Sequence, residues 1–304
     1  MISAKPRKYS THIRESFGDR VFLTFVYIVL AAVLLVVLYP LVYIVSASFS
    51  SPLAVSSGKV WLFPVDFSLR GYEVMLGDPQ IILGYANSLY YTFFGTLISV
   101  LLTITVAYPL SRPKLYGRGF LMFFITFTMI FSGGLIPTYM VVKQLGLLNT
   151  RWALIIPGAV AAFYVIIART FFQLNIPEEL AEAAEMDGCS DLNFLWKIVI
   201  PLSGPIIAIL ALMYAVGQWN AYFDALIYLK SASLQPLQLV LRSILILNLT
   251  VSGSVDAATL LERRELADLL KYTVVVVGSL PVLVLYPFVQ RYFVRGMLLG
   301  SIKG

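Results

Sequence analysis

The sequence has little charge, cysteine or histidine for its length. Of its 304 residues, 12% are charged and 59% are hydrophobic, whereas a typical soluble domain has about 25% charged and about 45–50% apolar residues. A chain with half the usual charge cannot cover a globule of this size with a hydrated surface, but contact with lipid removes that need. The composition therefore predicts an integral membrane protein.

The scarcity of reactive side chains excludes several kinds of site. Cys189 is the only cysteine, so no disulfide and no cysteine-based metal site can form within the chain. His12 is the only histidine, which leaves no histidine cluster for catalysis or metal binding. The sequence also lacks a glycine-rich phosphate loop followed by Lys and Ser or Thr. We expect no catalytic residue, metal or cofactor in this chain, and if ATP drives the protein, another chain must bind ATP and magnesium.

The net charge of +6 does not indicate a nucleic-acid partner. The basic residues are spread over loops and termini, without the interleaved aromatic side chains of a nucleic-acid-binding patch. This distribution is typical of a membrane protein whose topology is set by lysine and arginine.

Long apolar runs dominate what the sequence does contain. A membrane-spanning helix needs about 20 mostly apolar residues, and six stretches qualify: Val21–Phe49, Ser88–Leu110, Phe120–Val142, Trp152–Phe172, Pro201–Leu229 and Tyr272–Phe293. Their continuity indicates helices, because barrel strands would alternate. The first run could be a signal peptide, but it exceeds a signal core of about 7–15 residues. We predict an all-α integral membrane protein with six transmembrane helices in a single transmembrane domain, 1–304.

The positions of lysine and arginine predict the orientation. Five lie in the N-terminal tail 1–20, three in the loop after the second span, and three at the C-terminal end, which includes the tail 294–304. Because positive residues accumulate on the cytoplasmic side, both termini are expected in the cytoplasm. The loop after the fifth span carries five basic residues of its own, which weakens this bias. Loop 173–200, after the fourth span, is then cytoplasmic.

The loop after the fourth span carries the clearest local pattern. Pro177 suits the first turn of a helix, and Glu178 and Glu179 would face the positive end of the helix dipole. Gly188 would end this helix, and Ser190 would cap a second one beginning at Asp191. Six of the chain's 16 acidic residues lie between Glu178 and Asp191. A solvated acidic loop would explain the charge but not the small apolar face of alanines, which favours a docking helix.

The same segment resembles the EAA motif of permeases in binding-protein-dependent (MetI-like) ABC importers. The family pattern is E-A-A-x3-G-x9-I-x-L-P, and it corresponds here to Glu182-Ala183-Ala184, Gly188 and Ile198-Val199-Ile200-Pro201. Only Ile200, in place of Leu, departs from it. The resemblance implies that this helix, between the fourth and fifth spans, couples the permease to a cytoplasmic ATPase. The residues implied in coupling are Glu182, Ala183, Ala184, Asp187, Gly188 and Pro201.

Similarity to the family extends over nearly the whole chain. Segments such as Phe67–Tyr72 and the tail Gln290–Gly304 look like those of carbohydrate-importer permeases. Weaker similarity around Trp219-Asn220 and Leu237-Gln238 points to the branch that imports complex oligosaccharides, including uronate-containing ones. The resemblance implies a second homologous permease, two ATPase subunits, an extracytoplasmic substrate-binding protein, and a bacterial or archaeal cell (inner) membrane.

Polar and aromatic side chains gather in the predicted fifth span. Polar groups inside a span are costly and usually face a partner or a cavity. Sugars are bound by aromatic faces and by amides or carboxylates, and this cluster offers both, so it is a candidate substrate path. A polar clamp between helices is the alternative. The cluster comprises Gln218, Trp219, Asn220, Tyr222 and Asp224.

Other functions fit the sequence less well. An ion-coupled transporter would need ionisable relays within the membrane, and Asp224 is nearly the only candidate. A membrane-embedded enzyme would need a metal cluster or a nucleophile beside a base. An importer for amino acids or peptides remains an alternative to a carbohydrate importer.

Overall fold

The chain is helical throughout the part that the structure describes. The computed structural model describes residues 16–247 and 257–301, and no strand occurs within these ranges, which confirms the all-α prediction. The basic residues Lys5 to Arg14, and Lys303, lie outside the described residues. The helices are α1 Phe17–Ser48, α2 Pro52–Ser56, α3 Arg70–Leu76, α4 Pro79–Ser111, α5 Arg118–Ile130, α6 Leu135–Gln144, α7 Trp152–Ile155, α8 Ala162–Asn175, α9 Glu178–Met186, α10 Asp191–Phe194, the π-helix η1 Leu195–Val199, α11 Ile200–Leu202, α12 Gly204–Trp219, α13 Phe223–Tyr228, the 3-10 turn η2 Ala232–Leu234, α14 Leu237–Leu247 and α15 Ala257–Ser301.

Three helices are long and apolar enough to cross a membrane: α1, α4 and the part of α15 from Arg264 to Val284. Two sharply bent pairs, α5 with α6 and α10–α11 with α12, raise the number to five if each pair is one span. The sequence predicted six. The predicted fourth span is divided between α7 and α8, and the 14 residues of α8 reach only about 21 Å, less than the roughly 30 Å of a bilayer core.

The predicted third span is broken at its glycines. α5 ends at Ile130 and α6 begins at Leu135, with an angle of 116° between them. Gly134 has φ +81°, a backbone conformation that side chains other than glycine rarely adopt. Ser132-Gly133-Gly134 and Pro137 interrupt the helical pattern of the sequence here, and the structure confirms a break at this place, although hydropathy alone shows one continuous run.

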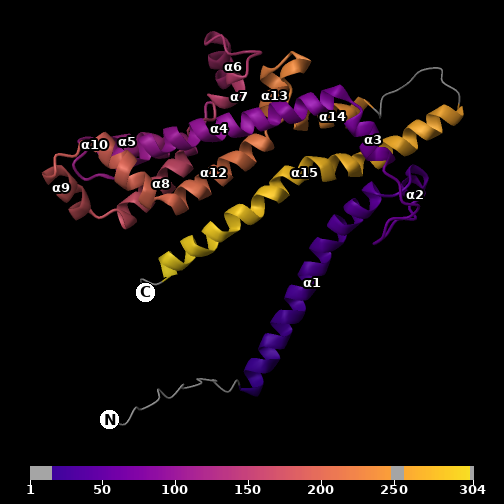
Figure 1. Ribbon diagram of the computed structural model, residues 1–304, viewed down its shortest axis with the longest axis horizontal. Helices are drawn as coiled ribbons and strands as arrows, with labels where there is room; N and C mark the ends of the chain where they lie inside the picture. Colours follow the sequence, from indigo (N-terminus) through magenta and orange to yellow (C-terminus); the bar gives the residue numbers. More distant parts are fainter. Residues whose placement is uncertain (1–15, 248–256, 302–304) are drawn as a thin grey trace, which may run out of the picture.

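α4 is the helix around which the others are arranged. It packs along α12 and α8 (Figure 1). The contact with α12 is close at Gly95, where an added Cβ would lie 2.8 Å from Cδ of Gln218. Nearer its N-terminus, α4 meets α14, and an added Cβ at Gly84 would lie 3.2 Å from Cα of Leu237. Small residues let these helix backbones approach closely, as is common in membrane bundles.

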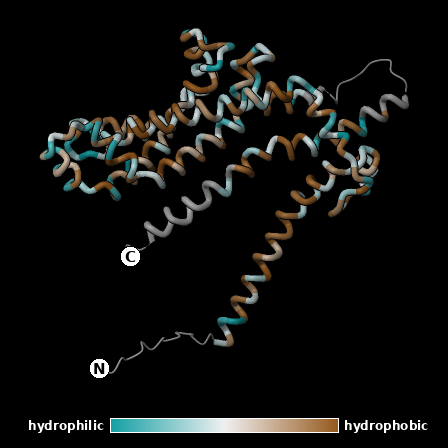
Figure 2. Tube along the Cα trace, in the orientation of Figure 1, coloured by the Kyte–Doolittle hydropathy of each residue, from teal (hydrophilic) through white to brown (hydrophobic). Residues whose placement is uncertain are grey.

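α1 stands apart from the other long helices for most of its length (Figure 1). Its C-terminal end packs against α15, where the rings of Tyr43 and Tyr272 meet edge to face at 5.5 Å. Its remaining surface is apolar and exposed, as the brown tube in Figure 2 shows. An exposed apolar helix of this kind indicates contact with lipid or with another membrane subunit.

Short helices cap the end of the molecule where α1 finishes. The predicted loop Ser50–Asn87 contains α2, α3 and the first turns of α4, which begins nine residues before the predicted span. The Tyr72 and Ser48 hydroxyls are hydrogen-bonded at 2.8 Å, and the ring of Phe49 lies 5.8 Å from that of Phe67. Likewise, α15 begins at Ala257, so much of the loop predicted after the fifth span is helical.

Candidate functional site

Helix α9 carries the first half of the motif. It begins at Glu178, with Pro177 as the N-cap residue, so Pro177 lies one position before the first turn in which the sequence placed it. Glu178 and Glu179 occupy the first turn, where a negative charge is stabilised by the helix dipole. The helix is therefore specified locally, by the proline before it and the acids at its start.

Gly188 makes the turn that follows α9. Its φ is +75°, and the Cys189 N–H donates to the Ala184 carbonyl at 2.9 Å, which closes the end of the helix. The Asn193 N–H then donates to Ser190 Oγ at 3.4 Å, and α10 begins at Asp191. This confirms the predicted turn at Gly188 and the predicted cap at Ser190.

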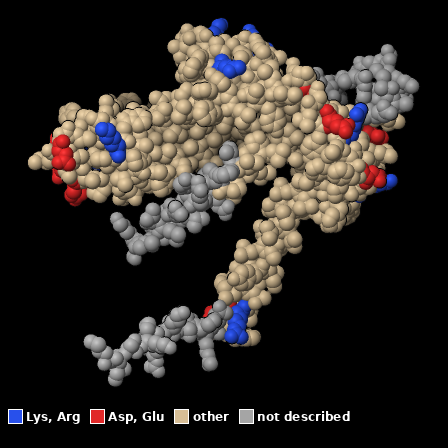
Figure 3. Space-filling model, in the orientation of Figure 1, with Lys and Arg blue, Asp and Glu red and all other residues tan. Residues whose placement is uncertain are grey.

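The two alanines of the motif face opposite ways. Ala184 is 8% exposed and belongs to the apolar cluster that also contains Tyr108 and Phe194, whereas Ala183 is exposed. The predicted alanine face is thus divided between internal packing and the surface. The outer surface of the turn also carries Met186, which is 89% exposed. Glu182, Asp187 and Gly188 are exposed as well, and Figure 3 shows one of the groups of acidic atoms at this end of the molecule.

The loop between α4 and α5 holds the inner side of α9. Lys114 Nζ lies 2.8 Å from Glu185 Oε2, and this hydrogen-bonded ion pair lowers the pKa of Glu185 and raises the pKa of Lys114. The Arg112 guanidinium lies over the rings of Tyr108 and Phe194, 5.0 and 5.5 Å from their centroids, in a cation–π arrangement. A cavity of about 370 Å³ separates the two segments. The ion pair and the packing of Phe194 and Ala184 with Tyr108 therefore join α9 and α10 to the end of α4.

The second half of the motif leads into α12. Residues Leu195–Val199 form the π-helical turn η1, and Pro201 lies exposed in the short α11. After Ser203 the chain bends by 83° and continues as α12. The motif therefore forms a continuous bent arm, a connecting segment that runs from the exposed turn at Gly188 to α12, the helix that packs on α4.

The predicted pathway residues separate into three groups. Gln218 packs against Gly95 of α4, and Trp219, which is 3% exposed, donates its indole N–H to the Gly278 carbonyl at 2.9 Å. These contacts are those of helix packing. Asn220 and Tyr222 instead line an open cavity of about 620 Å³. Asp224 lies exposed in the first turn of α13, outside the lining of that cavity.

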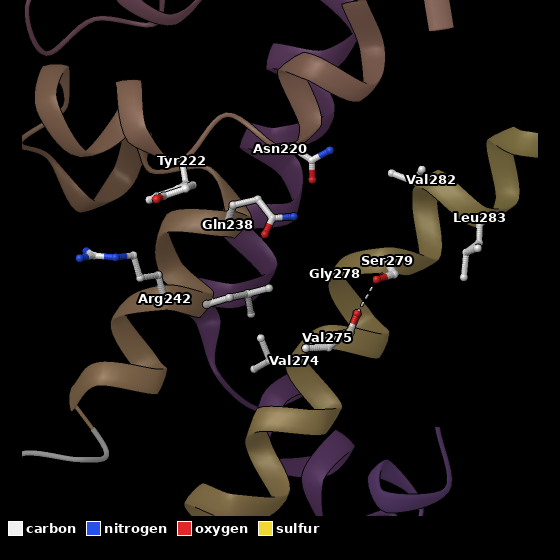
Figure 4. A pocket seen from close by; sticks show the side chains of 11 residues that line it. Asn220, Tyr222, Gln238, Arg242, Val274, Val275, Gly278, Ser279, Val282 and Leu283 are labelled. Atoms are coloured by element: carbon white, nitrogen blue, oxygen red, sulfur yellow. Dashed lines mark hydrogen bonds between the residues drawn. The ribbon is translucent and has the colours of Figure 1, made fainter. Parts of the chain in front are cut away.

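The 620 Å³ cavity lies between the end of α12, α14 and the middle of α15 (Figure 4). Gln238 and Arg242 from α14 and Ser279 from α15 add polar groups that the sequence did not predict as part of the substrate path, although Leu237-Gln238 carried part of the family resemblance. Arg242, a charged residue within the apolar sequence of α14, was the signal that could have indicated a binding site here. The predicted spans place this segment in the loop after the fifth span, and Arg242 is therefore absent from the predicted site residues. Within the described ranges, no group of three His, Cys, Asp or Glu residues could hold a metal ion.

Comparisons with known proteins give close matches over nearly the whole chain. Protein LplC of Bacillus subtilis (strain 168) is 41% identical over 269 residues, which cover 88% of this chain and 90% of that protein. The polygalacturonan/rhamnogalacturonan transport system permease protein YtcP of the same strain is 43% identical over 286 residues, covering 94% and 99%. A crystal structure of a bacterial ABC transporter involved in the import of the acidic polysaccharide alginate contains a similar chain. The two chains superpose with a TM-score of 0.84 and are 37% identical in sequence, and the match covers 92% of this chain and 99% of the chain in that structure.

A family model agrees with these matches and with the resemblance that the motif indicated. The model for the binding-protein-dependent transport system inner membrane component matches residues 81–299, which include α9, the bent arm and the 620 Å³ cavity. The chain therefore belongs to the family of binding-protein-dependent transport system inner membrane components.

Proposed function

We propose that this chain is a transmembrane permease subunit of an ATP-driven importer for a carbohydrate, specifically an oligosaccharide. The observation that carries the proposal is the exposed turn Met186–Gly188. The ion pair between Glu185 and Lys114 joins α9 to the loop after α4, and α10, η1 and α11 connect the turn to α12. Such an arm can pass the movement of a partner into the bundle. The relatives support the carbohydrate, since one is named for polygalacturonan and rhamnogalacturonan and a matching structure belongs to an alginate importer.

The proposed orientation places α9 and both chain ends in the cytoplasm. In Figure 1 α9 and the C-terminal end of α15 lie toward the same end of the molecule, and α2 and α3 lie at the other. The broken segments α5–α6 and α7–α8 would each count as one span, giving six. Breaks of this kind are tolerated where a segment packs against protein or lines a cavity.

In the proposed cycle this chain binds no ATP itself. A binding protein delivers the sugar to the α2–α3 end, and a second homologous permease completes the path. Two cytoplasmic ATPase subunits bind ATP and magnesium and close, and one of them moves α9. ATP and the loaded binding protein favour the outward-open state because each binds it better than the inward-open state.

An ion-coupled transporter is the competing function. It would leave the exposed turn at Gly188 without a role. An importer for amino acids or peptides is the other alternative, and the sugar-named relatives weigh against it.

Purification of the tagged chain from its native membrane in mild detergent tests the proposal. Mass spectrometry should find an ATPase and a second permease in stoichiometric amounts. If the chain purifies alone, under conditions that preserve another importer of this family, an ATP-driven mechanism through α9 is wrong.

A further inference from the structure

The 620 Å³ cavity has the size and position of a transport site. Its volume falls within the roughly 300–1,000 Å³ typical of small-molecule sites. The α15 residues that line it run from Val274 to Leu283, around the middle of a helix that extends from Ala257 to Ser301. The cavity therefore lies beside the middle of α15.

The walls of the cavity differ in chemistry. α15 contributes mostly aliphatic side chains, with the Ser279 hydroxyl hydrogen-bonded to its own helix at the Val275 carbonyl, 2.7 Å away. The facing wall carries the amides of Asn220 and Gln238 and the ring of Tyr222. In Figure 4 Tyr222 and Arg242 lie on the side of the cavity away from α15, and the two amides lie nearer to it.

Arg242 is the only charged residue among those that line the cavity. No carboxylate of the described residues lies within 4.0 Å of its guanidinium. In membrane proteins, charged side chains that face a cavity or a partner usually serve transport. Since no acidic residue lines the same cavity, its electrostatic potential favours an anion.

We infer that this cavity binds an anionic sugar residue, a uronate, and that Arg242 is the residue that selects its carboxylate. The inference rests on the proposed importer function and names its substrate class. The guanidinium offers two parallel N–H donors that match a carboxylate. The amides of Asn220 and Gln238 supply donors and acceptors for hydroxyls, and the Tyr222 ring supplies an apolar face.

Trp219 fixes one side of this site. Its indole N–H is bonded to the carbonyl of Gly278, a residue that also lines the cavity. The bond ties the end of α12, which carries Asn220, to the middle of α15. Trp219 is thus a positioning residue, and Arg242 is the residue that contacts the substrate.

Uptake by the whole importer, with its ATPases and binding protein, in proteoliposomes tests the inference. The probes are oligogalacturonates and oligoalginates and their methyl esters, which have the same length without the charge. The wild-type complex should take up the acids in preference to the esters. Arg242→Gln should lower acid uptake by about tenfold, the effect of one charged hydrogen-bonding partner, and change ester uptake little. Arg242→Lys should restore part of the selectivity.

Lys230→Gln is the matched control, because it removes a positive charge from an exposed side chain outside the cavity and should leave both rates unchanged. ATP-driven uptake of neutral sugars alone, or an equal loss of acids and esters in Arg242→Gln, would overturn the inference and leave the importer function standing. Loss of the assembled complex in Arg242→Gln would show instead that the arginine pairs with the second permease. Absence of ATP-driven uptake of any sugar would count against the proposed function itself.

Discussion

Gly188 is the residue on which the exposed turn depends. With φ +75° it has a conformation that costs about 1–2 kcal/mol for most other residues, and an added side chain would project into open space. We expect Gly188→Asp to abolish ATP-driven uptake while the chain still inserts and assembles, because both bulk and charge are added to the docking surface. Uptake in vesicles, with membrane insertion followed by immunoblot, measures this.

Gly117 provides the control for Gly188. It has the same φ of +75°, also has open space around it, and lies before α5 instead of in the α9 turn. Gly117→Asp should leave uptake largely intact. Equal losses in the two variants would attribute the effect to backbone strain, and normal uptake by Gly188→Asp would remove the docking role from this turn.

The ion pair between Lys114 and Glu185 makes a second prediction at the residue scale. Lys114→Glu should reduce substrate-stimulated ATPase activity, because α9 loses its link to the end of α4, and Lys114→Glu with Glu185→Lys should restore it. Lys114→Glu with Glu179→Lys is the control, since it restores the net charge but not the contact. Equal recovery in both double variants would show that net charge, not the pair, matters.

The same pair predicts a pH dependence. The pKa of Glu185 is lowered from 4.5, so its contribution is full above that value and is lost as pH falls through the lowered pKa. The pKa of Lys114 is raised from 10.5, so its contribution is full below that value and is lost as pH rises through the raised pKa. The distance between spin labels on α9 and the α4–α5 loop should therefore stay constant across neutral pH. A change near pH 7 would contradict this.

At the scale of elements, Trp219 joins α12 to α15. We expect Trp219→Ala to destabilise the folded chain by about 3–5 kcal/mol, because it leaves a cavity in an apolar cluster and removes the indole hydrogen bond to the Gly278 carbonyl. Trp219→Phe should cost less, about 1 kcal/mol from the lost hydrogen bond. Thermal unfolding in detergent measures both. Trp61→Ala is the control, since Trp61 is 69% exposed, and an equal shift there would contradict the packing role.

Elements with local signals were predicted well from the sequence. The helix from Glu178, the turn at Gly188 and the cap at Ser190 follow from residue preferences over a few positions, and the structure places each within one residue. The fate of Ala183 and Ala184 could not be predicted in this way. Which of two neighbouring alanines turns inward depends on the side chains of α4, which are distant in sequence.

The glycines Gly133 and Gly134 and Pro137 mark where the predicted third span breaks, but the angle of the bend and the 620 Å³ cavity could not be predicted from the sequence. Hydropathy measures transfer into an apolar medium, and a run such as Phe120–Val142 keeps that property whether or not Gly134 bends it. The cavity joins α12, α14 and α15, and its arginine belongs to a helix interpreted as part of a loop. Trp219 and Asn220 are neighbours in sequence, yet one packs and the other lines the cavity.

At the scale of the whole molecule, charge and apolar surface are separated. In Figure 3 acidic atoms gather at the α9 end and at the α2–α3 end, basic atoms lie at both ends and over α6, α7 and α13, and much of the remaining surface is uncharged. α1 adds a long exposed apolar helix to that surface. Lipid and a second permease together would cover it, as the proposed assembly requires.

ATP-driven uptake tests the importer function most directly. The assembled complex is reconstituted in proteoliposomes with its binding protein, and labelled oligosaccharide is counted inside with and without ATP on the ATPase side. The importer mechanism predicts uptake that requires both ATP and the loaded binding protein and that persists when ionophores collapse all ion gradients. Uptake that follows an ion gradient without ATP would contradict it and establish an ion-coupled transporter instead.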